Sequence, residues 1–249
     1  MRYFGGKTRT CKQISEILQA NLQEDRLFVS AFVGGGWVEC LIRGSKLCCD
    51  KHSYLIAMYQ ELQKGWNPPR FLTKEEYAYV KSHPDEKPYL TGFVGFGCSF
   101  AGKWFGGYAK DSTGRNFCLN AYNSIMKKME GFRDTTFECK DYRDLKPSNC
   151  VIYCDPPYSG TTQYSKKIVG DFDSDEFWST MRKWSEDNIV VISEYKAPED
   201  FDTIWSQEVK LDIRDANNKK KKRVEKLFTF KPTSDFVLPV KEEGLFDFL

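Results

Sequence analysis

The sequence predicts an α/β protein with a doubly wound, mainly parallel sheet, and three stretches of the chain carry this prediction. Residues 26–32 form an apolar run rich in strand-forming residues and lead into three glycines at 34–36. Residues 46–50 form a second short run that ends in an acid, and residues 150–154 form a third. A strand, a glycine-rich turn and a second strand ending in an acid are typical of nucleotide-binding α/β folds.

The other elements are predicted from periodicity and from capping residues. Thr73 and Glu76, and again Asp173 and Glu176, have the spacing of a capping box. Helices are predicted over residues 14–18, 37–42, 52–64, 73–82, 116–129 and 173–184, and further strands over 136–139, 189–192, 207–213 and 224–230. Residues 92–107 interleave glycines and aromatics without helix or strand periodicity, so we expect long loops or a hairpin there.

Composition limits the class of protein. A chain of 249 residues can form a large α/β domain, with or without an insertion. The net charge of +2 is too small to indicate a nucleic-acid partner by itself. No apolar stretch reaches the roughly 20 residues of a membrane span, so we expect a soluble, cytoplasmic monomer. Nine cysteines without a C-x-x-C pair, and two histidines, predict reduced thiols and no metal site.

The strand at 150–154 stops at Asp155-Pro156-Pro157-Tyr158, because neither proline can donate a ladder hydrogen bond. Open α/β sheets bind ligands at such carboxyl ends of strands. The Asp155 carboxylate and the Pro156 carbonyl can each accept one hydrogen of an amino group, and the Tyr158 ring can stack on the ring that carries it. This arrangement favours chemistry on an exocyclic amine. The structural alternative is a strand-ending turn with a solvent-facing aspartate.

Four motifs in register make the chain resemble the Dam-type, or D12 class, N6-adenine DNA methyltransferases, which use S-adenosylmethionine. They are Tyr3-Phe4-Gly5-Gly6-Lys7, Phe32-Val33-Gly34-Gly35-Gly36, Asp50 and Asp155-Pro156-Pro157-Tyr158. The resemblance implies a Rossmann-like methyltransferase sheet from residues 1–60 and 132–232. It also implies an inserted, mainly helical target-recognition domain at 61–131, and a tail at 233–249.

The resemblance also implies roles for single residues. Tyr3 and Lys7 would lie at the cofactor site, where the loop with Phe32, Gly34 and Gly36 cradles S-adenosylmethionine, and Asp50 would hold its ribose. Asp141 and Tyr142 would bracket the cofactor adenine, and Asp155 would lie between cofactor and target base. The chain departs from the family at one point: members usually carry Glu-Pro before the glycine loop, whereas this chain has Ser30-Ala31.

Candidate DNA contacts lie in three places. Lys103, Arg115 and Asn116 fall in the implied insertion, whose aromatic residues could equally form a core patch. Tyr164, in the polar run after Tyr158, could clamp a flipped base. The basic run that includes Lys220, Lys221 and Lys222 is predicted at a hairpin tip, where it could contact phosphates or form a solvated loop.

The tail ends in Leu245-Phe246-Asp247-Phe248-Leu249, four large apolar residues after an acidic, glycine-containing spacer. This end resembles the peptides by which bacteriophage replication and transcription proteins bind their sliding clamp. We expect either a clamp-binding peptide or a terminal element folded back onto the sheet.

Together these features predict direct methyl transfer to N6 of an adenine flipped out of a short site in double-stranded DNA. Methylation of another planar amine, such as cytosine N4 or a glutamine amide, is one alternative. A DNA-binding or partner-binding module without catalysis, which Ser30-Ala31 would permit, is the other. The sequence does not define the recognition site, for which GATC is the family default.

Overall fold

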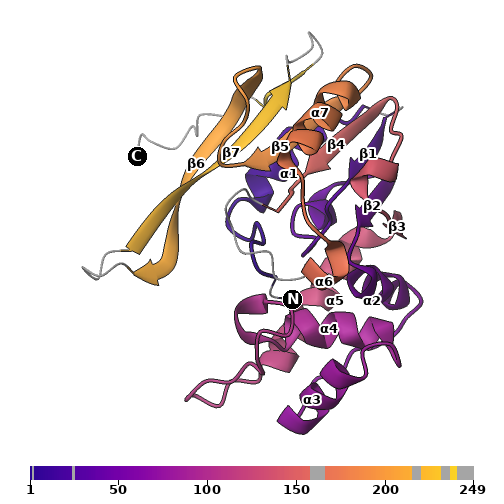
Figure 1. Ribbon diagram of the computed structural model, residues 1–249, viewed down its shortest axis with the longest axis vertical. Coiled ribbons are helices and arrows are strands. Elements are labelled where there is room, and N and C mark those ends of the chain that lie inside the picture. The colour runs from indigo at the N-terminus through magenta and orange to yellow at the C-terminus, as the bar shows by residue number, and fades with distance from the viewer. Residues whose placement is uncertain (2, 24–25, 158–165, 215–219, 231–235, 240–249) are drawn as a thin grey trace, which may run out of the picture.

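The computed structural model describes residues 1, 3–23, 26–157, 166–214, 220–230 and 236–239. Within these residues, seven strands form one sheet in the order β3-β2-β1-β4-β5-β7-β6 (Figure 1). The strands β1 to β5 pair in parallel, whereas β7 is antiparallel to β5 and β6. Their bounds are β1 Leu27–Ser30, β2 Lys46–Asp50, β3 Thr135–Cys139, β4 Cys150–Cys154, β5 Ile189–Glu194, β6 Phe201–Arg214 and β7 Lys220–Phe230. The predicted Rossmann-like α/β sheet is confirmed.

Helices connect the strands along the chain. The α-helices are α1 Cys11–Ala20, α2 Ser53–Gln63, α3 Lys74–Ser82, α4 Pro88–Gly97, α5 Phe117–Met129, α6 Lys166–Val169 and α7 Ser174–Trp184. Short 3-10 helices are η1 Glu39–Leu41, η2 Phe100–Gly102, η3 Glu130–Phe132 and η4 Tyr142–Asp144. No helix among the described residues is long and apolar enough to cross a membrane.

The parallel strands are buried on both faces, because successive side chains point to opposite sides of the sheet. Phe28 and Val151 belong to the core that includes the apolar face of α1. Their sequence neighbours Val29 and Ile152 belong to the core that includes α7. This burial explains why the strands read as continuous apolar runs rather than as alternating ones.

The segment α3 to α5 lies between α2 and β3 in the chain and gathers beside one end of the sheet (Figure 1). It shares a core with the sheet, since Tyr59 of α2, Phe93 of α4 and Phe137 of β3 belong to one buried cluster. The Tyr59 and Phe137 rings stack with their centroids 4.6 Å apart.

The expectation of loops or a hairpin over residues 92–107 is wrong for its first part, where α4 continues to Gly97. The helix is buried on all sides from Thr91 to Gly97, so its apolar residues show no helical period. Its glycines permit close packing: a Cβ at Gly92 would lie 2.0 Å from the Tyr54 carbonyl oxygen of α2. The sequence presents these glycines as helix breakers, whereas close packing requires them: Gly92 faces α2, Gly95 faces the Trp104 ring, and Gly97 faces Ala121 and Met1.

The helix expected over residues 37–42 is reduced to one 3-10 turn, Glu39–Leu41. Both N-cap residues are found where expected, but only the first of the two predicted capping boxes is complete. Thr73 and Glu76 form the full capping box, and Asp173 caps the start of α7 through the Asp175 and Glu176 amides. The carboxylate of Glu176 contacts Arg143 at 3.3 Å. The two last strands form a long antiparallel hairpin at one edge of the sheet, and the part of it beyond the pairing of β7 with β5 extends past the other strands (Figure 1).

Candidate active site

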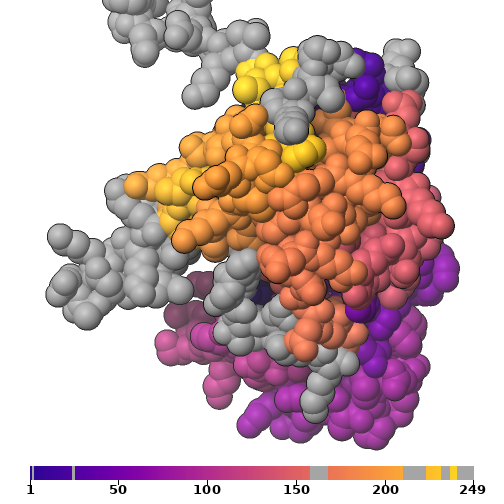
Figure 2. Space-filling model, turned by 45° about the horizontal axis from the view of Figure 1, so that its top comes forward, coloured from indigo at the N-terminus to yellow at the C-terminus, as the bar shows by residue number. Residues whose placement is uncertain are grey.

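A cavity of about 520 Å³ opens at the carboxyl ends of β1, β2 and β4, which Ala31, Asp50 and Asp155 mark in its wall. The segment α3 to α5 and the β6–β7 hairpin lie on different sides of the molecule, purple to magenta and orange to yellow in Figure 2. Side chains from both take part in the cavity, since Phe96 and Trp104 line it from the first and Arg223 lines it from β7.

The cavity brings together the cofactor residues predicted from the sequence. All of those proposed at the cofactor and target-amine sites line it except Tyr158: Tyr3, Lys7, Phe32, Gly34, Gly36, Asp50, Asp141, Tyr142, Asp155 and Pro156. Tyr158 and Tyr164 lie outside the described residues. Four motifs that are far apart in the chain therefore meet at one edge of the sheet.

The glycine loop adopts a backbone that favours glycine. Gly34 and Gly36 have φ angles of +46° and +61°, and a Cβ at Gly36 would lie 2.8 Å from the Phe132 ring. The loop is anchored on both sides, because the Tyr59 hydroxyl donates to the Gly34 carbonyl at 3.0 Å and the buried Lys128 ammonium donates to the Gly35 carbonyl.

Asp50 ends β2 and fixes the entry to this loop. One carboxylate oxygen accepts the Gly34 amide and the other accepts the His52 amide, both at 2.9 Å. Burial raises the pKa of Asp50, and these backbone hydrogen bonds oppose the rise. Each carboxylate oxygen has two lone pairs, so Asp50 can accept a ligand hydroxyl as well.

Asp155 follows β4 and contacts a buried cation. The Lys7 ammonium lies 2.5 Å from its Oδ1 and 4.0 Å from Oε2 of the buried Glu225 on β7. Glu225 in turn lies 2.6 Å from Arg223, whose guanidinium donates to the Tyr195 hydroxyl at 3.0 Å. A chain of charged groups thus links the cavity to the β6–β7 hairpin.

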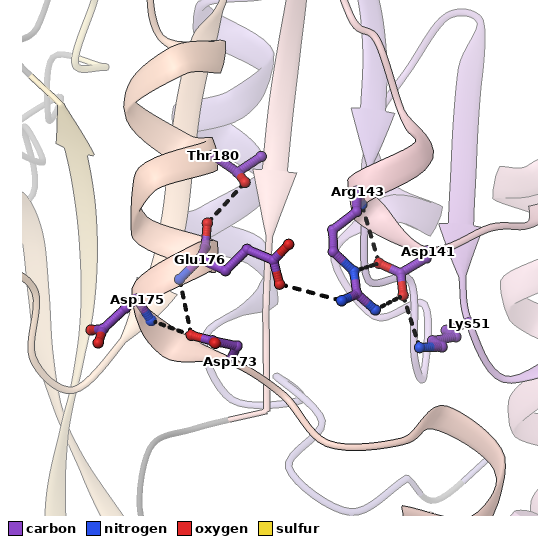
Figure 3. A network of polar contacts seen from close by, with 7 residues as sticks. All are labelled: Lys51, Asp141, Arg143, Asp173, Asp175, Glu176 and Thr180. Carbon is purple, nitrogen blue, oxygen red and sulfur yellow. Dashed lines mark hydrogen bonds and ion pairs between the residues drawn. The ribbon is translucent and has the colours of Figure 1, made fainter.

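Asp141 is held by two cations (Figure 3). Arg143 binds both of its carboxylate oxygens, at 2.9 and 2.6 Å, and the Lys51 ammonium lies 2.8 Å from Oδ2. Hydrogen bonding by Arg143 is the main reason why the pKa of Asp141 is held well below its usual value. An adenine amine at this place would share the carboxylate with Arg143.

Aromatic rings form one wall beside Asp141. The Tyr142 ring lies 5.4 Å from Phe32 and 6.2 Å from Phe172, measured between centroids. Burial raises the pKa of Tyr142 to about 12, so its hydroxyl stays protonated at neutral pH. An apolar wall of this kind suits the face of a planar ring.

The lining residues that the sequence did not indicate include three with polar groups beside the glycine loop and after β2: Trp37, Glu39 and His52. His52 Nδ1 accepts the Leu55 amide, which leaves the proton on Nε2. Burial lowers the pKa of His52 to about 4, so the ring is neutral. Its Nε2 and the Trp37 Nε1 are buried without a partner among the described residues. The sequence signal for two of these residues is that the indole of Trp37 and the acid of Glu39 stand in the otherwise apolar run after the three glycines.

The candidate DNA contacts are less closely grouped. The Lys103 ammonium lies 5.3 Å from the centre of the Phe4 ring, and the exposed Arg115 pairs with Asp111 at 3.7 Å. Asn116 caps α5, with its side chain bonded to the Leu119 amide and the Arg70 carbonyl. The expectation that Lys220, Lys221 and Lys222 lie at a hairpin tip is wrong for their backbone, which belongs to β7 because pairing with β6 continues to Lys220. Their side chains lie outside the described part of the chain.

The family model for the D12 class N6 adenine-specific DNA methyltransferases matches residues 3–94 and 103–225. No curated protein matches the chain. Among solved structures, a candidate RNA methyltransferase from Pyrococcus horikoshii has 10% identity and a TM-score of 0.39, with 92% of this chain and 90% of that chain covered. A Thermoplasma acidophilum protein has 10% identity and a TM-score of 0.36, with 90% and 99% covered. These likenesses are too low to carry an argument.

Proposed function

Because the chain belongs to the D12 class of N6-adenine-specific DNA methyltransferases, we propose that it transfers a methyl group from S-adenosylmethionine to N6 of an adenine flipped out of double-stranded DNA. The observation that carries this proposal is the shared cavity. Asp50 and Asp155 line it from strands on either side of β1, with the glycine loop between them. The residues proposed for the cofactor and the acid proposed for the target amine therefore line the same cavity.

The residues of the cavity fit the cofactor, which supplies an electrophilic methyl group on a sulfonium. The glycine loop leaves room for a ligand against the backbone, and Asp50 can accept ribose hydroxyls. The Trp37 and His52 ring N–H groups are buried donors without partners among the described residues, and both residues line the cavity. Buried donors of this kind gain most from a ligand acceptor.

Asp155 and the Pro156 carbonyl accept the two hydrogens of the target amine, and Tyr158 stacks on the base. Accepting both hydrogens would favour a more tetrahedral nitrogen whose lone pair is available to the methyl group that the cofactor supplies. As the N–C bond forms, the S–C bond would break, S-adenosylhomocysteine would leave, and one N6 proton would pass to the Asp155 carboxylate that holds it. Lys7 holds one oxygen of Asp155 and so fixes the plane of the carboxylate. Orientation and preorganised charge would supply most of the acceleration.

The segment 61–131 acts as the target-recognition unit in this proposal. Lys103, Arg115 and Asn116 approach DNA from this side, and Lys220, Lys221 and Lys222 contact phosphates from the hairpin. Tyr164 clamps the flipped base. Extruding a base costs a few kcal/mol, which such contacts must offset. The enzyme would act as a monomer.

The tail peptide Leu245–Leu249 lies outside the described residues, so its proposed role as a sliding-clamp ligand depends on its sequence alone. A tether of this kind would raise the concentration of enzyme near newly replicated DNA. Deleting residues 245–249 should abolish clamp binding and leave melting temperature and methylation of naked DNA unchanged. A lower melting temperature, with no clamp affinity in the full chain, would contradict the tether.

The activity is tested by expressing the chain in a host that lacks adenine methylation and sequencing the modified bases. We expect N6-methyladenine at one short sequence, and a loss of about 100-fold or more in Asp155→Asn. Asp144→Asn, which changes an exposed acid outside the cavity wall, is the matched control. N4-methylcytosine would favour the alternative amine. The absence of any modified base, in protein that binds S-adenosylmethionine, would favour a binding module.

A further inference from the structure

Glu39 is a buried carboxylate that the mechanism above does not use. It begins the 3-10 turn after the glycine loop and is 2% exposed. Its Oε1 accepts the hydroxyl of Ser30, the last residue of β1, at 2.8 Å. Among the described residues, no cationic side chain lies within ion-pair distance of this carboxylate. A buried carboxylate that no cation pairs is costly, so its retention calls for an explanation.

The electrostatics around Glu39 favour a positive charge beside it. Burial raises the pKa of Glu39 to about 7, with a further rise from Asp155. The hydrogen bond from the Glu39 backbone, the Ser30 hydrogen bond and the buried Lys128 lower the pKa without cancelling this rise. A cation bound beside Glu39 would favour the ionised carboxylate.

The strand order shows which ligand atoms can reach Glu39. Since β1 lies between β2 and β4, a ligand that extends from Asp50 to Asp155 passes over the end of β1, where Ser30 holds Glu39. If S-adenosylmethionine binds with its ribose at Asp50 and its methyl group toward Asp155, its amino-acid end is the part left to reach Glu39. That end carries an ammonium group.

We propose that the Glu39 carboxylate, oriented by the Ser30 hydroxyl, binds the α-ammonium of the methionine end of S-adenosylmethionine. This inference rests on the proposed function, because it assumes that cofactor. It also accounts for the departure at Ser30-Ala31. The carboxylate that the family pattern would place at position 30 is supplied from position 39, and the serine that replaces it becomes its hydrogen-bond partner.

The test is calorimetry of Glu39→Gln with three ligands: S-adenosylmethionine, S-adenosylhomocysteine and 5′-methylthioadenosine. The first two carry the ammonium, and the third lacks the whole amino-acid end. We expect affinity for the first two to fall about 10-fold to 100-fold, and affinity for the third to stay unchanged. Glu61→Gln, in an acid of α2 that does not line the cavity, is the control and should bind all three like the unmodified protein.

Other results would overturn the proposal. Unchanged affinity for all three ligands would remove Glu39 from the site, and an equal loss for 5′-methylthioadenosine would mean that it shapes the pocket. A loss for S-adenosylmethionine but not for S-adenosylhomocysteine would place Glu39 at the sulfonium. Ser30→Glu combined with Glu39→Gln moves the carboxylate back to position 30. It should restore the affinity for S-adenosylmethionine if the carboxylate is needed only for the ammonium. Failure of the unmodified protein to bind any ligand would contradict the proposed function itself, whereas normal methylation by Glu39→Gln with unchanged affinity would contradict this inference alone.

Discussion

The Lys7 ammonium and the Asp155 carboxylate, 148 residues apart in the chain, lie 2.5 Å from each other. The sequence assigns the two residues to different tasks, Lys7 to the cofactor and Asp155 to the target amine. Through this contact, a residue of the N-terminal motif orients the first residue of the Asp-Pro-Pro-Tyr motif. Lys7 also lies 4.0 Å from Glu225, so it bridges acids from two elements.

Lys7→Met should lower the methylation rate by about 100-fold, because Asp155 loses the partner that orients it. Cofactor affinity should fall less. In a double-mutant cycle with Asp155→Asn, measured by single-turnover kinetics, the two losses should be far from additive. The control is Lys12→Met, an exposed lysine of α1. A fall in cofactor affinity as large as the fall in rate would show that Lys7 acts on the cofactor.

Asp50→Asn should weaken S-adenosylmethionine binding by about 10-fold to 100-fold and leave the rate at saturating cofactor nearly unchanged. Two effects add here, because asparagine has an NH2 group in place of one carboxylate oxygen. This group cannot accept a ribose hydroxyl, and it cannot accept the backbone amide of Gly34 or His52. Calorimetry and turnover at high cofactor concentration separate affinity from rate. Unchanged affinity would remove Asp50 from the cofactor site.

Glu39→Gln should stabilise the ligand-free protein at pH 8 and have little effect at pH 4. The pKa of Glu39 is about 7 in the fold against 4.5 for an ordinary glutamate, so the folded state holds the proton more tightly. The stabilising contribution of this group is complete below pH 4.5 and is lost as pH rises through 7. The gap corresponds to about 3 kcal/mol, which glutamine would recover at high pH. Urea unfolding at the two pH values measures it; an equal change at both would mean that ionisation is not the cause.

Gly92→Ala should destabilise the fold by about 3 kcal/mol, because the new methyl group would collide with the backbone carbonyl of Tyr54. Helix propensity predicts the opposite sign, since alanine favours helices by about 1 kcal/mol over glycine. Thermal unfolding decides between them. Lys81→Ala, in the exposed last turn of α3, should change the melting temperature little.

Replacing Lys220, Lys221 and Lys222 with alanine should lower DNA affinity and reduce the salt slope of binding by about 3. Sequence preference should not change, because phosphate contacts carry no base information. The matched control removes the same charge from Lys12, Lys146 and Lys183, exposed lysines elsewhere on the chain. An equal loss of DNA affinity in both triple variants would mean that the net charge, and not the position of the lysines, causes the effect.

Local signals predicted much of this fold. The strands, the capping box at Thr73 and the glycine loop depend on residues close in sequence, and the structure has them where expected. The helix α4 does not follow from the sequence, because its glycines are explained by tertiary contacts, with α2 at Gly92 and with Trp104 at Gly95, which sequence periodicity cannot show. Both Phe201 and the first half of β6 were also missed, since polar residues dominate that edge strand.

The site was predictable where the chemistry lies in a motif and was not where it depends on tertiary contacts. Asp50 and Asp155 follow strands, so their places in the sheet follow from the fold. Glu39 is next to no other acid or cation in sequence, and its link to Ser30 appears after the glycine loop turns back on β1. Lys7 lines the cavity, but its pairing with Asp155 requires the assembled sheet and has no signal in the sequence.

If the segment α3 to α5 reads DNA as proposed, the buried cluster that joins Tyr59, Phe93 and Phe137 limits how the enzyme can acquire a new recognition sequence. The segment α3 to α5 is not a detachable cassette, because its helix α4 completes the hydrophobic core beneath β2 and β3. A transplanted segment would have to reproduce that inner face, glycines included, before its outer face could read any DNA. If this segment reads DNA as proposed, its specificity is expected to diverge through exposed residues, one substitution at a time, while the buried face stays unchanged.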